Sequence, residues 1–109
     1  MKKLLIAFAL SSLVSISFAN EQINDYEMAV KAFHNGEENE AFIHLKNALK
    51  ADPQHLSSKL LLAKVYFYAN NLGSAEKQLS EALDMGADIN LVLPLLGNVL
   101  LLQNKVDEL

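Results

Sequence analysis

Apolar side chains recur at helical spacing in five segments of this chain, and residues that favour turns separate the segments. In the first segment Tyr26, Val30 and Phe33 fall on one side of a helix, because residues three and four apart share a face. We therefore expect helices over roughly Ile23 to His34, Asn39 to Lys50, Pro53 to Ala69, Ser74 to Met85, and from about Asn90 onward.

Short polar sequences mark the expected helix ends. Asn35 and Gly36 suit the left-handed backbone that often ends a helix. Asp52 is expected to cap the third helix, with Pro53 in its first turn, where no N–H partner is needed. Ser74 is expected to cap the fourth helix.

The chain resembles itself under a shift of 34 residues. The positions that coincide are Ala29 with Ala63 and Gly97, Gly36 with Asn70 and Asn104, Ala41 with Ala75, Leu45 with Leu79, Ala48 with Ala82, and Leu49 with Leu83. Small residues at fixed places with this period are typical of tetratricopeptide repeats (TPRs), in which pairs of antiparallel helices stack into a solenoid. We expect an all-α TPR solenoid of about two and a half repeats, over residues 22–55, 56–89 and 90–109.

The small residues have a packing role in this prediction. At Ala29, Ala63 and Gly97 the first helix of each pair should pass close to the second, and at Ala41 and Ala75 the second helix should lie against the first. A larger side chain at any of these positions would push the helices apart.

The last expected helix is apolar over most of its circumference, and Pro94 is expected close to its first turn, where proline is tolerated. Leu109 matches Ala41 and Ala75, so the third pair would lack its second helix. Two explanations stay open. The chain is a truncated amino-terminal fragment of a larger array without independent activity, or the last helix packs on a partner or a second copy.

The first 19 residues have the three-part pattern of a secretory signal peptide. Lys2 and Lys3 provide the positive start, residues 4–16 are apolar apart from three serines, and Ser17 and Ala19 place small residues before the cleavage site. The apolar run is shorter than the ~20 residues of a membrane-spanning helix. We expect cleavage after Ala19 and export of residues 20–109 to the periplasm of a Gram-negative bacterium. The alternative is a membrane adaptor anchored by an uncleaved signal.

The charge balance and the absence of cysteine narrow the function classes. The formal net charge is −4, and signal cleavage removes two lysines and no acidic residue. Nucleic acid and anionic lipid both prefer basic patches, so neither is an expected partner. Because there is no cysteine, neither a disulfide nor a cysteine-linked lipid can be present.

The segment from Ala41 to Pro53 resembles a narrower family. It is similar to the run A-x-I-x-L-K-N-A-L-x-x-D-P of the PEP-CTERM system TPR-repeat (PrsT-like) proteins, and the similarity continues through residues 61–105. Those proteins are long exported arrays encoded beside exosortase protein-sorting and exopolysaccharide machinery, and they usually carry a lipid-anchoring cysteine. The resemblance implies a scaffolding role in assembling such an envelope system.

TPR arrays usually bind a peptide or helix on the concave face formed by the first helices of each pair. The expected lining residues are Tyr26, Val30, Phe33, His34, Leu60, Lys64, Phe67, Tyr68, Asn98, Leu101 and Leu102. This aromatic and aliphatic set favours an apolar peptide face. Tyr26 and Val30 stand where carboxylate-binding TPRs carry Lys and Asn. The alternative is that Phe33, Phe67 and Leu101 only pack between helices.

The remaining polar residues form no recognisable reaction centre. His34, His44 and His55 lie on different expected helices, so we expect surface histidines rather than a metal site. The acidic residues 37–40 stand where the second helix begins and complement its dipole. No phosphate-binding loop or nucleophile turn is present. The prediction is a non-enzyme without cofactor or small-molecule substrate, which binds a protein or peptide.

Overall fold

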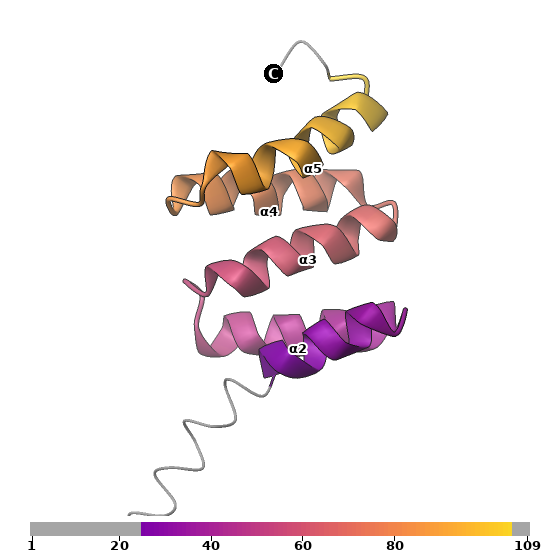
Figure 1. The fold of residues 1–109 in the computed structure, drawn as a ribbon, viewed down its shortest axis with the longest axis vertical. Coiled ribbons are helices and arrows are strands. Elements are labelled where there is room, and N and C mark those ends of the chain that lie inside the picture. The colour runs from indigo at the N-terminus through magenta and orange to yellow at the C-terminus, as the bar shows by residue number, and fades with distance from the viewer. Residues whose placement is uncertain (1–24, 106–109) are drawn as a thin grey trace, which may run out of the picture.

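Helices stacked along one direction make up the fold. The computed structural model describes residues 25–105, and within that range it contains five helices and no strand. The first covers residues 25–34 as far as it is described, and α2 (Glu38–Ala51), α3 (Leu56–Tyr68), α4 (Leu72–Asp84) and α5 (Ile89–Leu102) follow. Figure 1 shows the first helix and α2 at one end of the stack and α5 at the other. The expected signal peptide, residues 1–19, lies outside the described residues.

Three turns with the same backbone geometry confirm the 34-residue period. Gly36, Asn70 and Asn104 have positive φ angles of 74°, 59° and 58°. Each is followed by a hydrogen bond that closes the preceding helix in a Schellman-type end. These bonds run from Glu37 N to Ala32 O (2.9 Å), from Asn71 N to Tyr66 O (2.8 Å) and from Lys105 N to Leu100 O (2.7 Å). The described part of the third repeat therefore ends in the same turn that precedes α2 and α4.

The starts of α3 and α4 differ from the expected ones. Asp52 does not cap α3, because its carboxylate accepts the Gln54 N–H at 3.0 Å in the turn before the helix. His55 is the cap, and its Nδ1 accepts the Ser58 N–H at 3.3 Å. Asp52 precedes a proline, and this position disfavours helical backbone, so Asp52 is extended. As a result α3 begins at Leu56, after the expected start at Pro53.

For α4 the expected cap, Ser74, was also wrong. Asn71 caps this helix by accepting the Ser74 N–H at 3.4 Å, so Ser74 is already in the first turn. Because Asn70 has left-handed backbone, α3 ends at Tyr68, one residue before its expected end. Asn71 is then the next side chain able to cap a helix.

Pro94 lies deeper in α5 than expected. Asp88 caps the helix by accepting the Asn90 N–H at 2.9 Å, and Pro94 follows in the second turn. Since proline has no N–H, the Asn90 carbonyl receives no helical hydrogen bond at this point.

Small residues let the helices approach one another, as predicted. Ala29, Ala41, Ala63, Ala75 and Ala82 are all fully buried. Two core clusters result, one around Leu45 between the first helix, α2 and α3, and one around Leu79 between α3, α4 and α5. The helix α3 contacts α2, α4 and α5, and Tyr66 packs against both clusters. The core is therefore continuous through α3.

Gly97 is an exception to this packing. It was expected to lie close to the second helix of its pair, like Ala29 and Ala63, but a Cβ built on it would meet no heavy atom within 4 Å. No helix of residues 25–105 covers this side of α5. The absence of a side chain at Gly97 therefore has no packing role within the described chain.

Candidate functional site

The eleven predicted binding residues lie on three helices: the first helix, α3 and α5. We call these residues, Tyr26, Val30, Phe33, His34, Leu60, Lys64, Phe67, Tyr68, Asn98, Leu101 and Leu102, the A-helix face. Six of them are exposed, namely His34, Lys64, Tyr68, Asn98, Leu101 and Leu102, and the other five are half-buried. The face is thus anchored in the core but keeps accessible side chains along its length.

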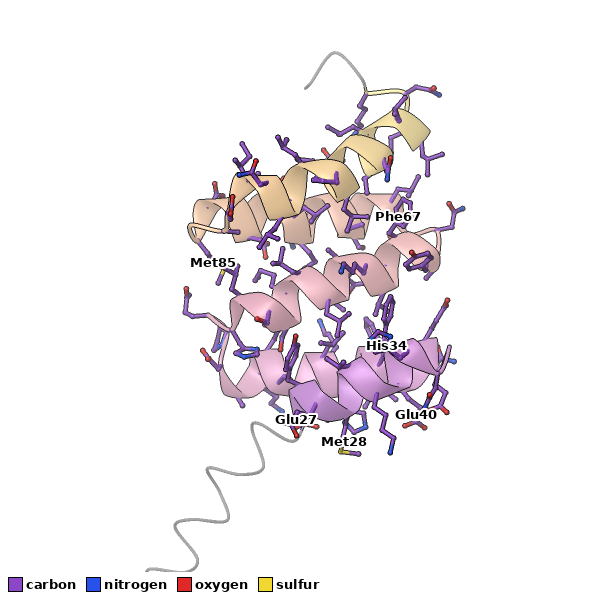
Figure 2. All side chains as sticks on the ribbon, in the orientation of Figure 1. Glu27, Met28, His34, Glu40, Phe67 and Met85 are labelled. Carbon is purple, nitrogen blue, oxygen red and sulfur yellow. The ribbon has the colours of Figure 1, made fainter. Side chains whose placement is uncertain are left out.

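Four rings from two repeats form an aromatic cluster on this face. The ring of Phe33 lies 5.8 Å from Tyr68 and 6.1 Å from His34, and Phe67 lies 5.5 Å from Tyr68. Figure 2 shows His34 and Phe67 on the same side of the stack, on the right in this view. These centroid distances are typical of favourable aromatic pairs. The aromatic cluster (Phe33, His34, Phe67 and Tyr68) therefore joins the first helix to α3.

Tyr68 is the most accessible member of the cluster. About two thirds of it (64%) is exposed, although the ring is large and largely apolar. Beside it, a pocket of about 200 Å³ is lined by Phe33, Gly36, Glu38 and Tyr68. An apolar side chain of a partner could enter this pocket and contact both rings.

Two of the seven predicted residues outside the aromatic cluster, Tyr26 and Leu60, pack against other elements of the fold. The Tyr26 ring contacts His55 edge to face at 5.1 Å, beside the start of α3. Because a helix rises 1.5 Å per residue, Tyr26 is about 10 Å from Phe33 along the helix axis. Leu60 packs against the second core cluster. These two side chains support the stacking of repeats more than they extend the accessible rings.

Sequence reasoning missed two residues of α5. Leu91, 68% exposed, shares a helix face with Asn98 and Leu102, and the exposed Pro94 lies beside them. The 34-residue shift could have found Pro94, since it is the counterpart of the predicted Leu60. With Leu91 and Pro94 included, the third part of the face is aliphatic where the first two parts are aromatic.

Charged pairs hold the helices together away from the aromatic cluster. The Lys59 ammonium donates to Glu81 at 2.7 Å and joins α3 to α4. Gln103 and Lys105 both donate to Glu76, at 2.9 and 3.2 Å, and these hydrogen bonds hold the pKa of Glu76 below its usual value. Among the eleven residues of the A-helix face, Lys64 is the only Lys, Arg, Asp or Glu. The face is therefore apolar in character.

The Lys59–Glu81 pair predicts a specific acid dependence of stability. The hydrogen bond from Lys59 lowers the pKa of Glu81 from its ordinary value of 4.5. The stabilisation is therefore complete above the unfolded-state value and is lost as pH falls through the lower, folded-state value. Between about pH 5 and about pH 3, the free energy of unfolding should fall less in Lys59→Met than in the parent. The difference should be no more than about 1 kcal/mol, because the pair is partly exposed. Urea titrations monitored by circular dichroism measure this, with Lys64→Met as the control. An equal acid dependence in both variants would contradict the assignment.

The three histidines do not converge. His44 lies 2.9 Å from Asp25, His55 caps α3, and His34 belongs to the aromatic cluster. Thus His44 and His55 are half-buried and have structural partners, and only His34 is an exposed surface histidine as expected. Residues 25–105 contain no cluster of three His, Cys, Asp or Glu able to hold a metal ion.

Glu38 and Glu40 stand in the first turn of α2, as predicted for the acidic run.

A family model described as tetratricopeptide repeat matches residues 32–98, which is more than half of the chain. The chain belongs to the tetratricopeptide-repeat family. No curated protein and no solved structure matches it. TPR proteins generally mediate protein–protein interactions, which makes the A-helix face of this TPR protein its candidate contact surface. Over the part of the TPR protein that the structure describes, every helix is too short or too polar to cross a membrane.

Proposed function

We propose that this TPR protein is an exported, non-catalytic scaffold that binds the apolar side of a partner helix or peptide on its A-helix face. The observation that carries the proposal is the aromatic cluster, in which Tyr68 is mostly exposed while Phe33 and Phe67 support it from two helices. Large rings held by neighbouring rings lose little conformational entropy on binding, and such residues often dominate binding energy.

The character of the face favours one class of ligand. A helix laid in a groove contacts it through apolar residues at positions such as i, i+3, i+4 and i+7. The aromatic part of the face and the aliphatic Leu91, Leu101 and Leu102 offer contacts to such a row of side chains. A peptide that binds through its terminal carboxylate would need convergent cationic groups, and Lys64 is the single such residue on the face.

The proposed setting is the periplasm, where the protein supports assembly of an envelope secretion or exopolysaccharide system. Two features of the sequence support this setting. One is the signal-like pattern of residues 1–19, and the other is the resemblance to the PEP-CTERM system TPR-repeat proteins. Both concern where and with whom the scaffold acts, and neither is needed for binding on the A-helix face.

Affinity capture from a periplasmic extract tests the proposed face. The chain is expressed in full and purified in the form that the cells accumulate, and its mass is measured first. A mass that begins at Asn20 supports export with cleavage, and an intact signal would indicate the anchored adaptor. We expect Tyr68→Ala to reduce capture of the principal partner by about tenfold or more, because truncating a central aromatic residue often costs 2 kcal/mol or more.

The matched control is Ile43→Ala. Ile43 is an apolar residue of α2 that is 56% exposed, and it is not part of the A-helix face. Its truncation should leave capture unchanged, while circular dichroism checks that both variants keep the parental helicity. Equal capture by the parent and both variants would rule out the aromatic cluster as the binding site.

A further inference from the structure

One line of α5 is apolar and uncovered along the length of the helix. Ile89, Leu93, Gly97 and Leu101 follow one another at intervals of four residues, which places them in a single ridge on the helix surface. The three large side chains of this ridge are about half exposed, and the space above Gly97 is open. We call these four residues the α5 ridge. Gly97 forms a notch between Leu93 and Leu101.

At the counterparts of Gly97 and Leu93, the other two repeats are covered by a helix that supplies a polar group. The counterparts of Gly97 are Ala29 and Ala63, and both are fully buried. The counterparts of Leu93 are Asp25 and Lys59, which pair with His44 of α2 and with Glu81 of α4. Leu93 can form no such pair. The α5 ridge therefore fits an apolar surface better than a helix like α2 or α4.

The α5 ridge also differs in charge from the rest of the protein. Residues 89–102 include no Asp, Glu, Lys, Arg or His, whereas every other described helix carries at least two charged residues. The whole chain has a formal charge of −4, so identical copies carry the same net charge and repel one another. At the α5 ridge two copies can meet without opposing like charges or burying an unpaired ion.

We propose that the α5 ridge binds the α5 ridge of a second copy of this chain. A two-fold axis would seat Leu93 of each copy in the notch at the partner's Gly97, since a symmetric interface pairs each residue reciprocally. Ridges of this spacing interdigitate at a crossing angle of about −50°. The aromatic cluster lies on the first helix and α3 and shares no residue with the α5 ridge, whereas Leu101 belongs both to the ridge and to the A-helix face.

The size of the α5 ridge predicts a weak dimer. We expect one helix ridge per copy to bury less than the ~800 Å² per partner of a standard interface. We therefore expect a dissociation constant on the order of 10 to 100 µM, and a dimer that forms as concentration is raised.

Sedimentation equilibrium over a range of concentrations tests the dimer, using the chain in the form that the cells accumulate. We expect the parent to shift from the monomer mass toward twice that mass. Gly97→Leu should weaken association by at least about tenfold, because it fills the notch that the partner's Leu93 needs. It should not lower the melting temperature, because the added side chain meets open space and leucine favours a helix more than glycine does.

Gly73→Ala is the control, since Gly73 is also helical with open space around it but lies on α4, off the ridge. It should associate like the parent.

A second variant, Leu93→Lys, places like charges on the two ridges and should also remain monomeric. Hydrogen exchange provides a readout without substitution, because the exchange of α5 amides should slow with rising concentration. A parent that stays monomeric overturns the proposal, and so does undiminished association of both ridge variants. Binding of the Tyr68-dependent partner should survive in Gly97→Leu, so the two proposals can fail separately.

Discussion

Truncating Leu79 to alanine should lower the free energy of unfolding by about 2–5 kcal/mol. Leu79 is almost completely buried at the centre of the second cluster, where residues of α3, α4 and α5 meet. Its loss would leave a cavity that the surrounding alanine-mediated helix contacts cannot easily close. A domain of this size is stable by only about 5–15 kcal/mol, so the variant should show a large fall in its urea midpoint.

Leu102→Ala is the control for the Leu79 prediction. It removes the same atoms from a side chain that is 61% exposed, and it should change stability by no more than about 0.5 kcal/mol. Urea unfolding followed by circular dichroism measures both variants. If the two substitutions destabilise equally, Leu79 is not a core residue and the assignment of the second cluster is wrong.

Enlarging Ala63 to leucine should destabilise the protein by about 1–3 kcal/mol for the opposite reason. Ala63 is fully buried in the second core cluster, and a larger side chain would separate the helices around it. The neighbouring Lys64→Ala should leave stability nearly unchanged, since Lys64 is exposed. Thermal unfolding gives the comparison, and equal melting temperatures for these two variants would contradict the repeat register.

A leucine at the counterpart of Ala63 in the third repeat sharpens this test. Position 97 has the same place in the 34-residue period, but its surroundings are open. The same final side chain should therefore destabilise the protein at position 63 and be tolerated at position 97. The contrast arises because position 63 is buried between helices, whereas position 97 faces open space.

The repeat period made the packing of this protein predictable. Alanines that coincide under a shift of 34 residues are buried in the structure, and Gly36, Asn70 and Asn104 share one turn geometry. Both results follow from local requirements: close helix contacts need small side chains, and a left-handed residue is best a glycine or an asparagine. Because these two requirements recur in each repeat, the same residue types in one repeat strengthened the structural prediction for the next.

Helix starts were less predictable, because several neighbouring side chains can cap. Asp52 and Ser74 are good caps in isolation, but His55 and Asn71 serve instead. The choice depends on where the preceding turn leaves the backbone, and a periodic pattern does not record this. The predicted packing of Gly97 was wrong for a related reason, because its equivalence to Ala63 in the repeat does not show whether a helix covers it.

The candidate site was partly predictable. Helical spacing placed Phe33 and Tyr68 on adjacent first helices, and their rings do meet. The same spacing could not show that Tyr26 turns toward His55 at the junction with α3. Which rings remain accessible depends on the angle between successive helix pairs, and that angle comes from packing across many residues.

The contact between Phe33 and Tyr68 crosses the joint between the first and second helix pairs. Solenoids bend at such joints, because each repeat touches only its neighbours. A ligand seated on both rings would hold the two pairs at one angle and stiffen the molecule. Binding could then alter the curvature of the whole array while leaving each helix pair unchanged.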